Sequence, residues 1–156
     1  MTTHPPAFPT ALKTGHVGLN VSDLDRSRDF YVSVLGLQVQ AEGDDHDRRW
    51  AFLGSGEQLM VTLWQQSTGR FSVAQPGLHH LSFQVDSIEE VYAVEATLRQ
   101  RLVEFAYDGV VPHGEGRGSG GIFFTDPDGI RLEVYAPSGA DTAPAPTAGA
   151  PTCGFF

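Results

Sequence analysis

The sequence has few cysteines and no long apolar run. Its 156 residues include a single cysteine, Cys153, so no disulfide can form within the chain and no cluster of thiolates can bind zinc. No stretch approaches the roughly 20 apolar residues of a membrane span, and the N-terminal residues lack the apolar segment of a secretory signal. We therefore predict a cytoplasmic protein that does not insert into a membrane.

Positive charge is also scarce. Ten lysines and arginines stand against 19 aspartates and glutamates, which gives a formal net charge of −9. Because binding to a phosphate backbone requires clustered positive charge, we do not expect nucleic acid as a partner. A small molecule is the expected binding partner.

The length and composition predict one domain with two flexible ends. Hydrophobic residues make up 40% of the chain, which is ordinary for a globular domain of this size. Residues 137–156 are rich in Ala, Pro, Gly, Ser and Thr, a composition that buries too little apolar surface to fold alone. We predict a flexible lead-in at 1–14, a domain at 15–136 and a tail at 137–156. The apolar end of the tail could dock on a neighbour, but disorder is the favoured interpretation.

The domain contains a weak internal repeat. The stretch HVGLNVSDLD, which begins at His16, aligns with HLSFQVDSIE, which begins at His80. Each stretch reads as a short strand that leads into helix-capping residues, and each is followed by a helical pattern and further strand-like segments. The sequence therefore predicts an α+β fold of two β-α-β-β-β modules, at 15–66 and 78–136.

The expected elements follow from the patterning within each module. In the first module a helix starts at Ser22 or Asp23 and stops at Gly36, and strands follow at 37–41, 48–54 and 58–65. In the second module a strand at 78–85 precedes a helix at 88–105, and strands follow at 121–125 and 130–135. The apolar helix positions are Val91, Val94, Leu98 and Leu102. The acidic run at 44–47 lacks the glycine and distal glutamate of a calcium loop, so we expect a solvated hairpin there.

Three of the predicted strands each have one unusually polar face. Alternation along a strand places His16 with Asn20, His80 with Gln84, and Glu133 with Tyr135. The opposite faces are almost wholly apolar and are expected to pack under the helices. Three aromatic residues of the first module could line an apolar pocket, although the core is the favoured location for them: Trp50, Phe52 and Trp64.

Residues 15–136 resemble the vicinal oxygen chelate superfamily, the group of the glyoxalases, bleomycin-resistance proteins and extradiol dioxygenases. The resemblance rests on the strand HVGLNV, on HHLSFQV, and above all on the closing segment FFTDPDGIRLEVYAP, in which a Pro-Asp-Gly turn sets a strand with an inward glutamate. It implies that the two modules form one curved mixed sheet around a cleft. It also implies a metal site of His16, His80 and Glu133 inside that cleft.

The implied ligand set narrows the chemistry without fixing it. Two imidazoles and one carboxylate suit a divalent ion with open positions, Fe²⁺ or Mn²⁺ first and Ni²⁺ or Zn²⁺ next. Thr62 occupies the place of a fourth ligand that proteins similar to glyoxalase I carry, which argues against that reaction. Ring-cleaving relatives usually carry a tyrosine where this chain has Phe123 and Phe124. Dioxygenase, lyase and transferase reactions all stay open.

The resemblance favours a metal-dependent enzyme whose substrate binds the metal through two neighbouring oxygens. His113, Tyr135 and Asn20 are the candidate proton-handling or orienting residues, in that order, and Arg117 shares the glycine-rich loop of His113. The alternative is a bleomycin-resistance type of protein that sequesters a small molecule without catalysis, and the acidic charge suits a cationic compound. Many members of the family form dimers, which leaves a homodimer open.

Overall fold

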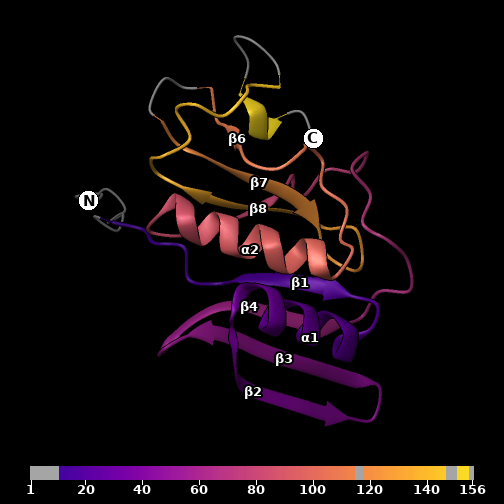
Figure 1. The fold of residues 1–156 in the computed structure, drawn as a ribbon. Helices are drawn as coiled ribbons and strands as arrows, with labels where there is room; N and C mark the ends of the chain where they lie inside the picture. Colours follow the sequence, from indigo (N-terminus) through magenta and orange to yellow (C-terminus); the bar gives the residue numbers. More distant parts are fainter. Residues whose placement is uncertain (1–10, 115–117, 147–150, 155–156) are drawn as a thin grey trace, which may run out of the picture.

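The computed structural model describes residues 11–114, 118–146 and 151–154, and two similar modules make up most of it (Figure 1). Module one contains β1 (Val17–Val21), α1 (Leu24–Leu35), β2 (Gln38–Asp45), β3 (Arg48–Ser55) and β4 (Gln58–Gln65). Module two contains β5 (Leu81–Gln84), α2 (Ile88–Gln100), β6 (Val111–Pro112), β7 (Gly120–Thr125) and β8 (Arg131–Ala136). A short 3₁₀ turn, η1 (Thr152–Gly154), follows. The predicted order of elements in both modules is confirmed.

The two modules have the same strand topology. Module one forms a four-stranded sheet in the order β1-β4-β3-β2, here called sheet A, and module two forms sheet B in the order β5-β8-β7-β6. In each sheet the first strand pairs in parallel with the last, and the remaining pairs are antiparallel. The α+β class is confirmed. Within one chain, however, the strands form two sheets and not the single curved sheet that was expected, and β1 and β5 are edge strands.

The helix boundaries follow from their caps. Asp23 accepts a hydrogen bond from the Arg26 backbone N–H at the start of α1, and Gly36 ends that helix in the left-handed region. Helix α2 starts with a capping box between Ser87 and Glu90, but it ends at Gln100, five residues before the predicted boundary. Leu102 adopts a φ of 57° just beyond it and is 89% exposed, so its prediction as a position of the helix was wrong.

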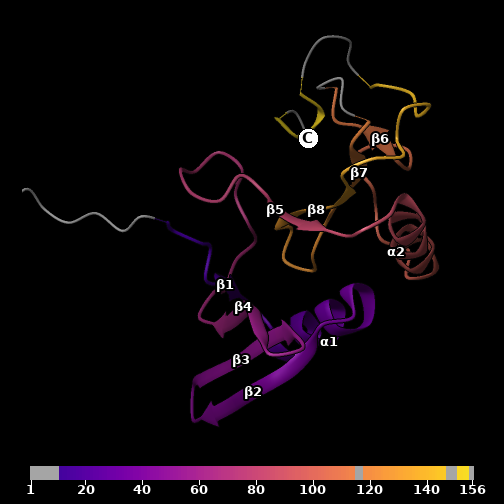
Figure 2. The same cartoon turned by 90° about the vertical axis from the view of Figure 1, so that its left-hand side faces the viewer.

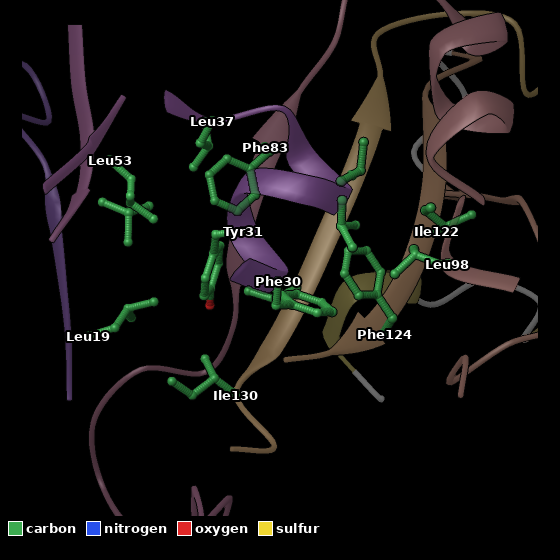
Figure 3. Packing of buried hydrophobic residues seen from close by; sticks show 14 of the residues in the cluster. Leu19, Phe30, Tyr31, Leu37, Leu53, Phe83, Leu98, Ile122, Phe124 and Ile130 are labelled. Atoms are coloured by element: carbon green, nitrogen blue, oxygen red, sulfur yellow. The ribbon is translucent and has the colours of Figure 1, made fainter. Parts of the chain in front are cut away.

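Side chains of helix α1 pack between sheet A and module two. Phe30 and Tyr31 of this helix lie between side chains of sheet A, such as Leu53, and side chains of module two, such as Phe124 (Figure 3). The rings of Phe30 and Phe124 have their centroids 6.4 Å apart. Both helices lie on the same side of the molecule in Figure 2, so one continuous apolar core joins the modules.

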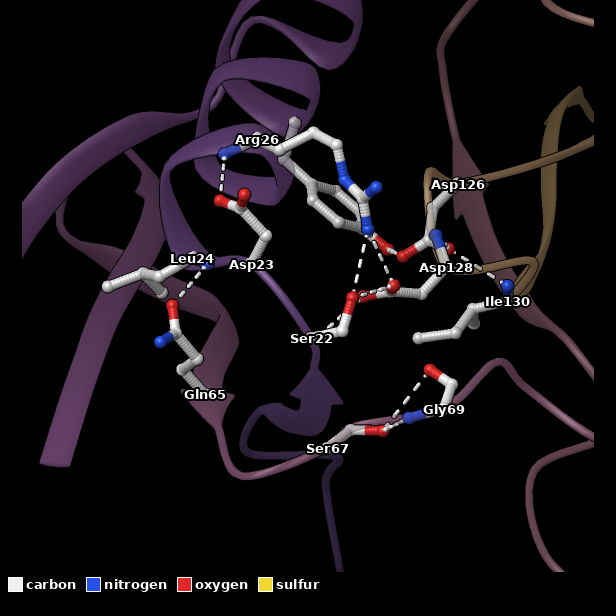
Figure 4. Close-up of polar contacts among 11 residues, drawn as sticks. Ser22, Asp23, Leu24, Arg26, Gln65, Ser67, Gly69, Asp126, Asp128 and Ile130 are labelled. Atoms are coloured by element: carbon white, nitrogen blue, oxygen red, sulfur yellow. Dashed lines mark hydrogen bonds and ion pairs between the residues drawn. The ribbon is translucent and has the colours of Figure 1, made fainter. Parts of the chain in front are cut away.

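A polar contact also joins the modules, at the turn between β7 and β8 (Figure 4). The carboxylate of Asp128 accepts hydrogen bonds from the Ser22 backbone N–H at 2.8 Å and from the Arg26 guanidinium at 2.7 Å. The carboxylate of Asp126 accepts from the hydroxyl of Tyr31 at 3.0 Å. Both aspartates are buried, so the Pro-Asp-Gly turn binds module one as well as reversing the chain.

Two side chains of the expected C-terminal tail are buried. Ala140 belongs to the core, and Thr152 is 3% exposed. The Thr152 hydroxyl donates to the carbonyl of Pro112 at 2.6 Å, and its N–H donates to the carbonyl of His113 at 3.2 Å. Part of this segment therefore packs on module two. Among the described helices, none has the length and apolarity needed to span a membrane.

Candidate functional site

Each module begins with a histidine at the entry to its first strand. His16 immediately precedes β1 and is exposed, whereas His80 immediately precedes β5 and is half-buried. The predicted alternation of polar and apolar faces holds in module two, where Phe83 and Val134 are buried beneath α2 and Ser82 is exposed. The polar face of sheet B therefore points away from the core, as expected.

Glu133 is the centre of that polar face. It is only 3% exposed, and its two carboxylate oxygens face two imidazoles. Nε2 of His113 lies 2.5 Å from Oε1, and Nε2 of His80 lies 3.3 Å from Oε2. Because an ionised carboxylate can only accept, Nε2 of His113 donates to Glu133, and Nδ1 shares a second hydrogen bond with the Ser119 hydroxyl at 3.0 Å.

The charge states of this cluster follow from its surroundings. Burial alone would raise the pKa of Glu133, but hydrogen bonds from His113 and Ser82 and the charge of the imidazoles lower it below its usual value. Burial lowers the pKa of His80, partly opposed by the Glu133 charge. At neutral pH the cluster thus contains an ionised carboxylate and a neutral imidazole at His80, which are the forms that bind a metal ion.

An open cavity of about 470 Å³ gives access to Glu133, and we call it the Glu133 pocket. Its lining consists of Ser82, His113, Ser119, Glu133, Tyr135, Pro137 and Cys153. The Tyr135 hydroxyl donates to Gln84 at 2.8 Å, and the Tyr135 ring lies beside His113 with 5.1 Å between centroids. A buried carboxylate therefore lies at the bottom of the pocket, and several hydroxyl groups lie in its walls.

The structure brings together four of the six predicted site residues: His80, His113, Glu133 and Tyr135. His16 and Asn20 belong to module one, His16 at the entry to β1 and Asn20 within β1. Asn20 accepts a hydrogen bond from the Gln66 backbone N–H at 3.0 Å, so it has a structural contact at the end of β1. Across the described residues, no three His, Cys, Asp or Glu side chains are grouped so that they could hold one metal ion.

Two parts of the pocket were missed by sequence reasoning. Ser119 orients His113 from a glycine-rich loop, where no pattern singles out one serine. Cys153 lies on the segment anchored by Thr152, and the composition of the tail gave no sign that it packs here. Arg117, the other loop residue considered, lies outside the described residues.

The three aromatic residues of module one are not in the core, contrary to the favoured expectation. Trp50, Phe52 and Trp64 lie on the outward face of sheet A, and Trp64 is 37% exposed. The alternation of β3 explains this, because the inward positions are taken by Ala51 and Leu53. The outward face of sheet A is thus aromatic where that of sheet B is ionisable.

The donor set of module two fits a divalent metal. A buried carboxylate and a neutral imidazole nitrogen face each other across 3.3 Å at the base of an open pocket. These nitrogen and oxygen donors suit Fe²⁺, Mn²⁺, Ni²⁺ or Zn²⁺. Two donors leave an ion short of protein ligands, so a site built on His80 and Glu133 needs at least one further residue.

Known proteins of similar sequence include enzymes of different activities. A catechol-2,3-dioxygenase of Bacillus subtilis is 28% identical over 127 residues, which cover 78% of this chain but 40% of that protein, so the chain spans less than half of its length. A lactoylglutathione lyase of Neisseria meningitidis serogroup A is 30% identical over 140 residues, which cover 85% of this chain and 97% of that protein.

A solved structure has the same fold. The fosfomycin resistance protein FosX of Listeria monocytogenes, solved with Mn(II) and sulfate, matches with a TM-score of 0.59 over 83% of this chain and 93% of that chain at 20% identity. A family model matches residues 13–134, nearly the whole described domain. The chain therefore belongs to the Glyoxalase/Bleomycin resistance protein/Dioxygenase superfamily.

Proposed function

We propose that this protein is a metal-dependent enzyme that binds a small-molecule substrate through two neighbouring oxygen atoms. Glu133 and His80 would hold the divalent ion, with His16 as the third ligand. The observation that carries the proposal is the buried Glu133 carboxylate, whose oxygens face two imidazoles at the base of an open pocket. A merely structural glutamate would not need an accessible cavity above it.

The bound metal would act as a Lewis acid toward the substrate oxygens. His113 is suited to move a proton, because Nε2 carries a hydrogen toward Glu133 and Nδ1 is positioned by Ser119. Tyr135 lines the pocket, and its ring lies beside the His113 ring and restricts it. The reaction class, dioxygenation included, depends on the substrate, since relatives of this fold carry several activities.

We further propose that His16 reaches this site from a second copy of the chain. Strands β1 and β5 are the edges of sheets A and B, and His16 and His80 lie at the entries to these two strands. A two-fold pairing of β1 of one copy with β5 of the other would bring the two polar faces together. Each dimer would then contain two identical sites.

Manganese binding tests the metal site. Wild-type protein purified without chelator should take up about one Mn²⁺ per chain, whereas E133Q and H80A should lose at least tenfold in affinity because each removes a ligand. E89Q and H46N are matched controls, since Glu89 lies on the exposed side of α2 and His46 in the β2–β3 hairpin. No uptake of manganese, iron, nickel or zinc by the wild type would overturn the enzyme proposal.

A heterodimer tests whether the site is shared. H16A and H80A chains with different affinity tags are co-expressed, and the mixed dimer is purified through both tags. If each site uses residues of both copies, one of its two sites keeps all its ligands, so it should bind about half the wild-type manganese. Homodimers of either variant should bind almost none. A heterodimer as empty as the homodimers would overturn the shared site.

Sequestration of a small molecule is the competing function. It predicts ligand binding that EDTA does not change and that survives the loss of Glu133 or His80. The acidic net charge favours a cationic ligand in that case. The manganese titration separates the two functions, because only the enzyme requires the ion.

A further inference from the structure

The outward face of sheet A carries a compact aromatic cluster that the proposed metal chemistry does not use. Trp50 and Phe52 have ring centroids 4.6 Å apart, and Trp64 lies 6.3 Å from Trp50 and 5.9 Å from Phe52. We call these three residues the aromatic shelf. None of them belongs to the core, although exposing large aromatic side chains has a cost in free energy.

Neighbouring residues hold the shelf in place. The Trp64 indole N–H donates to the hydroxyl of Thr62 at 2.9 Å, and Thr62 is itself buried. The Trp50 ring lies against Gly43 of β2, where an added Cβ atom would come within 2.6 Å of the indole. The rings are therefore oriented before any ligand arrives, which lowers the entropy cost of binding.

The shelf borders a hollow whose rim is charged. The cavity measures about 270 Å³ and is lined by Asp45, Arg48, Arg49, Trp50, Trp64 and Gln66. Arg49 is engaged by both carboxylate oxygens of Asp25 at 3.0 Å. Arg48 has one ion pair, 3.1 Å long, with the exposed Asp45, and its own side chain is 82% exposed. Because an exposed ion pair is weak, Arg48 can turn to an anionic ligand.

We propose that the aromatic shelf binds the planar aromatic ring of a small-molecule ligand that carries a negatively charged group. The ring stacks on Trp50 and Trp64, and the anionic group pairs with Arg48. The identification of this ligand as the substrate rests on the proposed function, which would pair sheet A with the Glu133 pocket of another copy. Binding of the ring to the shelf requires neither the metal nor the second copy.

The hollow favours a small ligand over a second protein chain as the occupant. A stable protein interface buries roughly 800 Å² per partner and needs a broad complementary surface. The hollow beside the shelf measures only about 270 Å³ and has charged residues at its rim. Two arginines and one aspartate among its six lining residues leave a formal charge of +1 (2 − 1), in contrast with the net charge of −9 of the whole chain, and this contrast matches an anionic ligand.

The chain contains only two tryptophans, and both belong to the shelf, so their indole N–H signals report on it directly. The experiment is a ¹⁵N–¹H NMR titration of the EDTA-treated full-length protein with 2-naphthoate. W50F and W64F assign the two signals. Both should shift and saturate with 2-naphthoate, whereas cyclohexanecarboxylate, which has the charge without the ring, should leave them in place.

Two variants, each with a control, locate the ligand. G43A pushes the Trp50 ring off β2 and should weaken 2-naphthoate binding about fivefold, whereas G69A, which has open space around it, should bind like the wild type. R48A should weaken 2-naphthoate about threefold but leave uncharged 2-naphthol unchanged, and R101A on module two is its control. R48A and the cyclohexane probe keep the test decisive if G43A does not fold.

Equal shifts with the saturated acid, or 2-naphthoate binding that neither G43A nor R48A weakens, would overturn the proposal. Binding that disappears as sedimentation shows self-association would also overturn it and assign the shelf to contact between copies. The titration uses metal-free protein, so a negative result here is separate from failure of the manganese site. Conversely, a wild-type protein that takes up no metal would leave the 2-naphthoate result standing.

Discussion

The two modules have the same topology but differ on their outward faces. Sheet A carries Trp50 and Trp64 on that face, whereas sheet B carries Glu133 with His113. Their inward faces are alike, because both pack aliphatic and aromatic side chains under a helix and into one core. The repeat thus preserves what packing requires and leaves the outward face free to differ, and the candidate chemistry lies on that face.

The modules also differ in the hairpin turn before their last strand. The turn of module two carries Asp126 and Asp128, which bind Tyr31, Ser22 and Arg26 of module one. The corresponding turn of module one, at Gly56, has exposed neighbours on both sides. Module two therefore holds module one through a buried polar contact, and the described part of the turn at Gly56 makes no such contact with module two.

Removing the Asp128 carboxylate should have the largest effect on stability. D128A leaves the Ser22 backbone N–H without its acceptor and removes the ion pair to Arg26, so we expect a loss of about 2–3 kcal/mol. D108A is the control, because Asp108 is fully exposed and makes one long ion pair with Arg99, and it should leave the stability almost unchanged. Urea unfolding followed by circular dichroism measures both. Equal losses would show that the turn does not hold the modules together.

Local patterns predicted the elements well but not the arrangement of the modules. The caps at Asp23 and Gly36 and the alternation around His80 and Glu133 depend on near neighbours in the chain, and these features match the structure. The contact between Phe30 of module one and Phe124 of module two joins residues that are far apart in the sequence. Nothing local reveals that contact.

Some side chains of the candidate site were also predictable from the sequence, and others were not. Alternation placed Glu133 with Tyr135 and, on another strand, His80 with Gln84, whereas the meeting of these faces was implied by the family resemblance. The loop position of His113 made it a candidate. The favoured core location of Trp50 and Trp64 was wrong, because apolar character alone does not tell which face of a strand is buried. The role of His16 stays a prediction, since it depends on an arrangement beyond one chain.

Two buried carboxylates of module two should respond to pH in opposite ways. Burial raises the pKa of Asp126 to about 6, although backbone N–H groups and Tyr31 lower it in part. Between about pH 4 and 6 the folded protein therefore keeps a proton that the unfolded chain has lost, and stability falls as pH rises through this window. The lowered pKa of Glu133 has the opposite sign: its contribution is present above the usual glutamate pKa and is lost on acidification.

The substitution D126N isolates the first effect. The amide oxygen can still accept from the backbone N–H groups of Asp128 and Ile130, while the ionisable proton is gone. The unfolding free energy of D126N minus that of the wild type, measured with urea, should rise by on the order of 2 kcal/mol from pH 4.5 to pH 7. The same difference for E133Q should fall as the pH rises through the acidic range. A wild-type minus D126N difference that does not vary with pH would contradict the assignment.

Substitutions at the ends of the two helices should change the stability least. Helix α1 ends at Gly36 with a φ of 68°, whereas Leu102 takes a φ of 57° just after α2, in a region that favours glycine. L102G relieves that strain and loses few contacts, because Leu102 is 89% exposed, but it also makes the unfolded chain more flexible. We expect a net gain of about 0.5 kcal/mol for L102G and a loss of about 1 kcal/mol for G36A. If L102G destabilises the protein in urea unfolding, then the exposed leucine makes a contact that outweighs the strain, and a second copy of the chain is the first place to look for it.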